Sequence, residues 1–241
     1  MNLNFTDEYV FYTVQGEGQL AGFPSVFVRL SGCNLRCSWR NTDGTLTKCD
    51  TPHSSFYPEK NIQDIGETID KILAFGCDHV VVTGGEPFLQ GHVAFLIDQL
   101  VLKGCHVTVE TNGTKYLPTK ASLLSISPKL STSSCDPESG IMHNLKRINL
   151  SALFDMMKNN PYQLKFVINT DAELQEVIEL VKDLTDLGVK DVYKNVWLMP
   201  QGITTEQFNE RAEMLFEACK KYGFKYSDRL HVRIFGNKKG V

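Results

Sequence analysis

The sequence has no long hydrophobic run and only a small excess of charge. No stretch of the 241 residues approaches the roughly 18–20 uninterrupted apolar residues of a membrane helix. The first ten residues, MNLNFTDEYV, lack the basic and apolar regions of a signal peptide. The 25 basic and 28 acidic side chains give a formal net charge of -3, which does not favour a nucleic-acid-binding protein. We therefore expect a cytoplasmic protein with no membrane or nucleic-acid partner.

Internal repeats, low-complexity tracts and linkers are also missing. A hydrophobic content of 42% is ordinary for a globular protein and excludes a disordered chain. The length is enough for one domain with a sizeable buried core, so we predict a single domain spanning residues 1–241. The seven cysteines are an odd number, which in a reducing compartment argues against a disulfide framework and raises the question of metal binding.

Short β-branched runs alternate with amphipathic stretches from residue 24 onward, which predicts repeated βα units and a largely parallel sheet. The predicted strands are residues 26–30, 79–83, 105–110, 123–127, 164–168, 196–199 and 230–234. The predicted helices lie around residues 62–73, 174–181 and 208–218. Thr204 and Gln207 resemble a capping box before the last of these, and the polar segment 131–143 is predicted to be a surface loop. Because parallel βα folds carry their chemistry at the carboxyl ends of strands, the residues just after each strand are the candidate site.

Three cysteines, Cys33, Cys37 and Cys49, follow the first of these predicted strands within 17 positions. Thiolates suit both zinc and iron–sulfur clusters. A structural zinc site normally needs four ligands, often as paired CxxC units, and the sequence contains no such pair. His53 could serve as a fourth ligand, so a structural zinc-binding domain remains an alternative that is not an enzyme. The other four cysteines are scattered singly, and we interpret them, like the histidines outside the candidate site, as structural residues.

The cysteine loop resembles that of the radical S-adenosylmethionine (SAM) superfamily, whose usual motif is CxxxCxxC. Cys33 and Cys37 keep the CxxxC spacing of this motif, whereas Arg40 stands at the position of the third cysteine. A nine-residue insertion, residues 40–48, moves the expected Cys-Asp-Thr to Cys49-Asp50-Thr51. The segment Thr83-Gly-Gly-Glu-Pro87 is similar to the GGE element of the superfamily. The resemblance implies an incomplete (β/α) barrel of the radical SAM type. It also implies a [4Fe–4S] cluster held by Cys33, Cys37 and Cys49, with one iron left open for SAM.

Further motifs resemble the 7-carboxy-7-deazaguanine synthase family within that superfamily. They are Val14-Gln-Gly-Glu-Gly18, Cys49-Asp-Thr51, Glu110-Thr-Asn-Gly113 and Ser127-Pro-Lys129, and the resemblance runs from about residue 5 to the end of the chain. It implies a lyase of queuosine and 7-deazapurine biosynthesis. The implied reaction is a SAM- and Mg²⁺-dependent radical ring contraction of 6-carboxy-5,6,7,8-tetrahydropterin to 7-carboxy-7-deazaguanine with loss of ammonia.

The family resemblance also implies site residues. The implied substrate contacts are Val14, Gln15, Gly16, Arg29, Thr83 and His231, and Thr51 matches the Mg²⁺-binding threonine of the family. The implied SAM contacts are Lys48, Asp50, Gly85, Glu86, Ser127, Pro128, Lys129, Met199, Pro200, Gln201 and Gly202. No catalytic residue is expected beyond the cluster and SAM. The expected partners are a pterin substrate, a reductant such as flavodoxin or ferredoxin, and a second copy of the chain in a homodimer.

A second enzyme class shares part of these motifs. A radical SAM enzyme that activates a glycyl radical on a partner protein would have the same cysteine loop and GGE element. It should bind a peptide instead of a pterin, and it has no evident use for Gln15-Gly-Glu-Gly18 together with Thr51. We therefore prefer the ring-contracting lyase and keep the activating enzyme as the enzymatic alternative.

Overall fold

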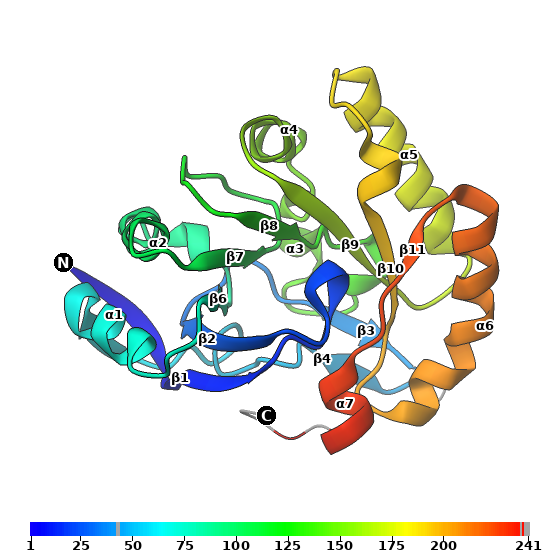
Figure 1. Cartoon of the computed structure of the whole chain (residues 1–241). Helices are drawn as coiled ribbons and strands as arrows, with labels where there is room; N and C mark the ends of the chain where they lie inside the picture. Colours follow the sequence, from blue (N-terminus) through cyan, green and yellow to red (C-terminus); the bar gives the residue numbers. More distant parts are fainter. Residues whose placement is uncertain (42–43, 237, 239–241) are drawn as a thin grey trace.

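Nine strands of the described residues form one curved sheet in the order β11-β10-β9-β8-β7-β6-β2-β1-β5 (Figure 1). The computed structural model describes residues 1–41, 44–236 and 238. The strands of the sheet are β1 (Asn2–Val14), β2 (Pro24–Leu30), β5 (Asn61–Asp64), β6 (His79–Gly84), β7 (His106–Thr111), β8 (Leu123–Ile126), β9 (Tyr162–Ile168), β10 (Val196–Pro200) and β11 (Lys225–Tyr226). Neighbouring strands are parallel from β2 across to β11, whereas β1 is antiparallel to both β2 and β5.

The described residues form seven helices, most of which cover the outer side of this sheet. They are α1 (Ile65–Leu73), α2 (Val93–Leu102), α3 (Gly140–Lys146), α4 (Leu150–Asn159), α5 (Ala172–Asp186), α6 (Thr205–Tyr222) and α7 (Leu230–Phe235). Figure 1 shows α1, α2, α4, α5 and α6 arranged along the convex side, while the sheet stays open between its two edge strands. The predicted incomplete (β/α) barrel is confirmed.

Helix α1 illustrates how the sequence builds the core. The Asp64 carboxylate caps the helix by accepting the Gly66 N–H at 2.7 Å. Ile65, Ile69 and Ile72 recur on one face and are buried against the sheet. Burying one isoleucine side chain stabilises a fold by about 1.5–3 kcal/mol, so the same pattern repeated along the outer helices holds them against the strands.

Six of the predicted strands coincide with β2, β6, β7, β8, β9 and β10, but the seventh prediction is wrong. Residues 230–234 lie in α7, although their alternating Leu-His-Val-Arg-Ile pattern is typical of a strand. After β11, the chain leaves the edge of the sheet before it reaches α7. The Leu230 N–H donates to the Gly16 carbonyl at 3.0 Å, which directs the segment toward the open side of the barrel. Gly236, at a φ of 64°, ends the helix.

Two further local predictions need correction. Thr204 caps α6 by accepting the Gln207 N–H at 3.3 Å, but the Gln207 side chain accepts from Ile203 instead of returning to Thr204, so the capping box is only half formed. The segment 131–143 is not simply a surface loop. It contains a 3₁₀ turn, η3 (Ser131–Ser133), and the first part of α3, and its last residue, His143, is buried.

The nine-residue insertion completes an antiparallel hairpin of β3 (Ser38–Arg40), which begins two residues before it, and β4 (Leu46–Lys48). Residues 42 and 43 of the insertion lie outside the described part of the chain. Trp39 packs with Leu35 and Cys37 in a small apolar cluster of its own, separate from the main core. The hairpin is therefore anchored beside the cysteine loop.

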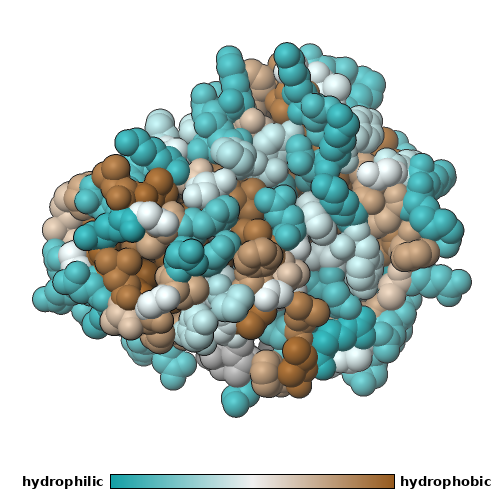
Figure 2. Space-filling view, viewed as in Figure 1, coloured by the Kyte–Doolittle hydropathy of each residue, from teal (hydrophilic) through white to brown (hydrophobic). Residues whose placement is uncertain are grey.

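None of the described helices is long and apolar enough to cross a membrane. Hydrophilic residues cover much of the helical rim in the space-filling view, whereas a group of hydrophobic residues lies at its lower edge over α7 (Figure 2). Two residues of α7, Ile234 and Phe235, are 69% and 52% exposed.

Candidate active site

A cavity of about 550 Å³ lies at the carboxyl ends of the parallel strands. Its wall includes Thr83 and Gly84 at the end of β6, Thr111 at the end of β7, Ser127 after β8 and Gln201 after β10. This is the edge of the sheet at which parallel βα folds place their ligands. The volume is within the range of small-molecule and cofactor sites.

The cysteine loop forms one side of the cavity, and all three of its thiols, Cys33, Cys37 and Cys49, line it. The Cys49 N–H donates to the Cys37 carbonyl at 2.9 Å, so the hairpin returns the chain to the place where it left. Burial raises the pKa of all three thiols, that of Cys33 to about 11. Buried thiols of this kind become thiolates when a metal centre takes the place of the proton.

The surroundings of the thiols fit an iron–sulfur cluster. The Leu35 N–H and the Asn112 side-chain amide both donate to Cys33 Sγ, at 3.4 and 3.8 Å, and the Thr51 hydroxyl lies 3.4 Å from Cys49 Sγ. Hydrogen bonds to ligand sulfurs are typical of cluster sites. Nowhere in residues 1–41, 44–236 and 238 do three His, Cys, Asp or Glu side chains come together as one metal ion requires.

The residues predicted for the substrate come together on the other side of the cavity. All six, Val14, Gln15, Gly16, Arg29, Thr83 and His231, line it. The His231 ring lies directly against Gly16, where an added Cβ would approach His231 Nδ1 to 2.3 Å, so a larger residue at position 16 would have to displace the ring. Burial lowers the pKa of His231, which makes it neutral at pH 7. The N-terminal segment around Gly16 and the C-terminal segment around His231 therefore form one wall of the cavity.

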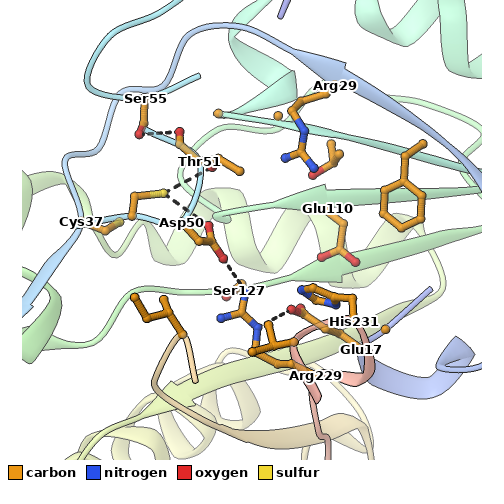
Figure 3. Close-up of a pocket in the computed structure, with 18 of the residues that line it drawn as sticks. Glu17, Arg29, Cys37, Asp50, Thr51, Ser55, Glu110, Ser127, Arg229 and His231 are labelled. Atoms are coloured by element: carbon orange, nitrogen blue, oxygen red, sulfur yellow. Dashed lines mark hydrogen bonds and ion pairs between the residues drawn. The ribbon is translucent and has the colours of Figure 1, made fainter. Parts of the chain in front are cut away.

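A charged network lines the cavity, and Asp50 is its one member that the family resemblance assigns to a ligand. Lys165 Nζ lies 2.5 Å from a Glu17 oxygen and 2.9 Å from a Glu110 oxygen. Arg229 Nε is 2.8 Å from the other Glu17 oxygen, and its terminal nitrogen pairs with Asp50. Figure 3 shows Arg229 between Asp50 and Glu17, with Glu110 and His231 beside them. Three carboxylates and two cations thus face a single cavity.

The buried charges of Glu17 and Lys165 are stabilised by their partners. Burial alone would raise the pKa of Glu17, but Lys165 and Arg229 outweigh it and hold that pKa far below its ordinary value. Burial would lower the pKa of Lys165, yet Glu110 and Glu17 raise it. One sequence signal could have revealed the network: Lys165 stands inside the apolar strand Tyr-Gln-Leu-Lys-Phe-Val-Ile, and a lysine on a buried strand needs an acidic partner.

The residues predicted for SAM divide into two groups. Those that line the cavity are Lys48, Asp50, Gly85, Ser127, Lys129, Met199, Gln201 and Gly202, whereas Glu86, Pro128 and Pro200 do not line it. Gly85 sits so close to the Gly32 carbonyl that an added Cβ would lie 2.2 Å from its oxygen, which explains the glycine. Gln201 is 3% exposed, and its Oε1 has no hydrogen-bond partner among the described residues. That oxygen is a buried acceptor available to a ligand.

Glu86 is turned away from the cavity and is 1% exposed. Its carboxylate accepts from the Phe88 N–H at 3.0 Å, the Thr111 hydroxyl at 2.8 Å and the Asn112 N–H at 2.7 Å. Burial raises its pKa to about 7 in spite of these donors. The side chain thus joins the end of β6 to the end of β7 from behind the cavity wall.

The open (β/α) barrel with three cysteines on the loop after β2 is the arrangement of a radical SAM enzyme, and residues 27–218 match the radical SAM superfamily. The chain is 39% identical over 236 residues to the 7-carboxy-7-deazaguanine synthase of Rhodopirellula baltica, covering 96% of this chain and 86% of that one. It is 36% identical over 240 residues to the same enzyme of Halobacterium salinarum, covering 95% and 89%. The chain belongs to the 7-carboxy-7-deazaguanine synthase family of the radical SAM superfamily.

A solved structure agrees with this assignment at the level of the fold. The crystal structure of QueE from Escherichia coli matches with a TM-score of 0.67 at 22% sequence identity, over 95% of each chain. As a member of its family, the protein is a radical SAM lyase of queuosine and 7-deazapurine biosynthesis. Membership of the superfamily implies a [4Fe–4S] cluster and SAM as cofactors.

Proposed function

We propose that this protein converts 6-carboxy-5,6,7,8-tetrahydropterin to 7-carboxy-7-deazaguanine in a SAM- and Mg²⁺-dependent ring contraction that releases ammonia. One observation carries the proposal. A single cavity of about 550 Å³ is lined by the three loop cysteines, by Thr51 and by every residue predicted to contact the pterin. The relatives named 7-carboxy-7-deazaguanine synthase support the same reaction.

We propose that Cys33, Cys37 and Cys49 hold the cluster and that SAM occupies the adjoining part of the cavity, near Gly85, Lys129 and the Gln201 acceptor. When bound, the cluster and SAM together supply the carbon-centred radical that removes a hydrogen atom from the substrate. The chain's own residues contribute orientation. They hold the substrate beside the source of the radical, and the surrounding walls limit the access of water.

The charges of the cavity suit a pterin that carries a carboxylate. Arg29 stacks over the Phe11 ring, with its guanidinium carbon 5.5 Å from the ring centroid, and it forms no ion pair with any residue in the described part of the chain. Its guanidinium is thus available to bind the substrate carboxylate in a bidentate manner. The Gln15 amide, which donates to Glu110 at 3.2 Å, and the Glu110 carboxylate offer a donor and acceptor edge to the pterin ring.

The Mg²⁺ site would be completed by the substrate. Thr51 offers one hydroxyl to the cavity, next to Asp50, whose carboxylate pairs with Arg229. Mg²⁺ prefers six oxygen ligands in an octahedron and often keeps several waters, so oxygens of the substrate and water must fill the remaining positions. The metal would then bind as part of the substrate complex. We also propose a single radical SAM domain, a homodimer in the cytoplasm and a small electron-transfer protein as reductant.

Anaerobic turnover tests the proposed reaction. Reconstituted protein is incubated with SAM, a strong reductant, Mg²⁺ and 6-carboxytetrahydropterin, and the products are analysed for ammonia and 7-carboxy-7-deazaguanine. Formation of both in equal amounts is expected. Cleavage of SAM without either product would favour the glycyl-radical activating enzyme. A colourless protein that holds zinc and neither iron nor sulfide would favour a structural zinc domain.

A further inference from the structure

Asn112 lies in the turn after β7, and its side-chain amide is one of the two donors to Cys33 Sγ. It belongs to the motif Glu110-Thr-Asn-Gly113, its side chain is 6% exposed, and it lines the cavity beside Cys33. Its Nδ2 is 3.8 Å from Cys33 Sγ and 3.1 Å from Asn34 Oδ1. A buried amide next to a proposed cluster ligand can influence that ligand if its NH₂ group faces the sulfur.

The contacts at the other end of the amide fix this orientation. Asn112 Oδ1 accepts from the Thr114 N–H at 3.0 Å and from the Thr114 hydroxyl at 2.6 Å. A backbone N–H can only donate, so the oxygen end must face Thr114 and the NH₂ end must face Cys33. The Asn34 side chain closes the network by donating to the Thr114 hydroxyl at 2.8 Å. A flipped amide would lose these contacts and leave the Thr114 N–H opposite another donor.

The backbone of Asn112 is held as firmly as its side chain. Its N–H donates to Glu86 Oε2 at 2.7 Å, and the same carboxylate binds the Thr111 hydroxyl and the Phe88 N–H. Glu86 is buried behind the cavity wall and does not line it. Its contacts therefore place Asn112, and Asn112 in turn contacts the cysteine.

We propose that Asn112 is a positioning residue that donates a hydrogen bond to the Cys33 thiolate and thereby raises the reduction potential of the cluster. Such a bond withdraws charge from the sulfur and stabilises the reduced cluster, which carries one more negative charge. The second donor to this sulfur, the Leu35 N–H at 3.4 Å, belongs to the backbone. Asn112 is thus the donor that a side-chain substitution removes. The inference rests on Cys33 being a cluster ligand, as proposed above.

A redox titration of the anaerobically reconstituted full chain tests the proposal. The reduced cluster is followed by electron paramagnetic resonance without SAM or pterin, so the result does not depend on turnover. The variants are Asn112→Ala, which removes the donor, and Asn112→Asp, which keeps the shape and replaces the NH₂ group by a carboxylate oxygen. The matched control is Asn160→Ala. Asn160 is 8% exposed, its amide is bonded to Tyr116 and Thr119, and it does not line the cavity.

At the midpoint potential of the parent protein, both Asn112 variants should show an about tenfold lower ratio of reduced to oxidised cluster, which is 59 mV for a one-electron couple. Asn160→Ala should match the parent. Unchanged potentials in both Asn112 variants would overturn the proposal. So would loss of the cluster from both variants, because Asn112 would then only hold the loop. Retention of a full cluster in Cys33→Ala would instead contradict the ligand set. Because the titration contains no SAM or pterin, lack of product in the turnover experiment would contradict the proposed reaction and not this inference.

Discussion

The Cys49 N–H donates to the Cys37 carbonyl at 2.9 Å across the base of the β3–β4 hairpin. In an uninterrupted CxxC segment, the first cysteine carbonyl and the last cysteine N–H are the groups that a hydrogen-bonded β-turn joins. The inserted residues 40–48 extend this turn into a hairpin and leave its closing hydrogen bond in place. A chain with an interrupted cysteine motif can therefore present Cys37 and Cys49 as neighbours.

Removal of the hairpin should preserve cluster binding. In a variant lacking residues 40–48, Trp39 joins Cys49 directly and the CxxxCxxC spacing is restored. Because the closing hydrogen bond is local, the shortened loop should bind iron and sulfide at the level of the parent chain, as measured after anaerobic reconstitution. The same deletion carrying Cys49→Ala is the matched control and should bind none. A shortened chain that folds but takes up no iron would show that the hairpin itself is needed.

Loss of the buried cation Lys165 should destabilise the fold. Lys165→Met leaves Glu110 and one oxygen of Glu17 without their partner, and breaking a buried ion pair typically costs about 3–5 kcal/mol. Urea unfolding of the cluster-free chain measures the free energy of unfolding. Lys182→Met removes a lysine from an exposed pair with Asp186 and should change little. Equal effects of the two substitutions would argue against the network.

His143 should make stability depend on pH. Burial, together with Lys129 and Arg147, lowers its pKa to about 4, and its Nδ1 accepts the Arg36 N–H at 3.2 Å within the cysteine loop. The unfolded chain, with a histidine pKa of about 6.5, binds the proton more strongly. The stabilisation is therefore complete above about pH 6.5 and is lost as the pH falls toward 4.

The size of this effect follows from the two pKa values. When the pH falls from 7 to 5, the contribution of His143 should lower the free energy of unfolding of the cluster-free chain by about 2 kcal/mol. The difference is measured by urea unfolding at both pH values. His143→Gln should be less stable at pH 7 and should lack this part of the pH dependence. An equal slope in the parent and the variant would refute the prediction.

Thr51 should govern the response to Mg²⁺. Thr51→Val keeps the shape of the side chain and removes the hydroxyl, so the Mg²⁺ concentration for half-maximal turnover should rise by about tenfold or more. Thr51→Ser retains the oxygen and should stay near the parent. Steady-state rates over a Mg²⁺ titration give the comparison. Equal Mg²⁺ responses of the valine and serine variants would place the metal elsewhere.

Local patterns made much of the fold and part of the site predictable. Six apolar runs correctly predicted strands. Polar residues that follow these strands line the cavity because the carboxyl ends of parallel strands lie at the same edge of the sheet. The N-terminal strand was not predicted because its register shifts between Phe5 and Val10, where the Thr-Asp-Glu stretch interrupts the alternation. Helix α7 was mistaken for a strand because only its contact with Gly16 shows that it leaves the sheet edge.

Local patterns indicate only that Lys165, inside an apolar strand, needs an acidic partner, and they do not identify the partners in the charged network. Arg229 and Asp50 lie far apart in the sequence and meet only when the last helix packs against the N-terminal motif. The orientation of Glu86 away from the cavity also depends on contacts with residues distant in the sequence. The glutamate of the GGE element stands where a ligand contact is expected, but its carboxylate accepts from Thr111 at the end of β7 and from Asn112 in the turn that follows.

The most direct test of this account is the iron and acid-labile sulfide content of the anaerobically reconstituted chain and four single variants. The parent and Cys77→Ala should be brown and hold about four irons and four sulfides per chain, whereas Cys33→Ala, Cys37→Ala and Cys49→Ala should hold none. Cys77 is the control because its thiol contacts backbone carbonyls outside the cavity. A parent that binds zinc without iron or sulfide, or a full cluster in Cys49→Ala, would contradict the account.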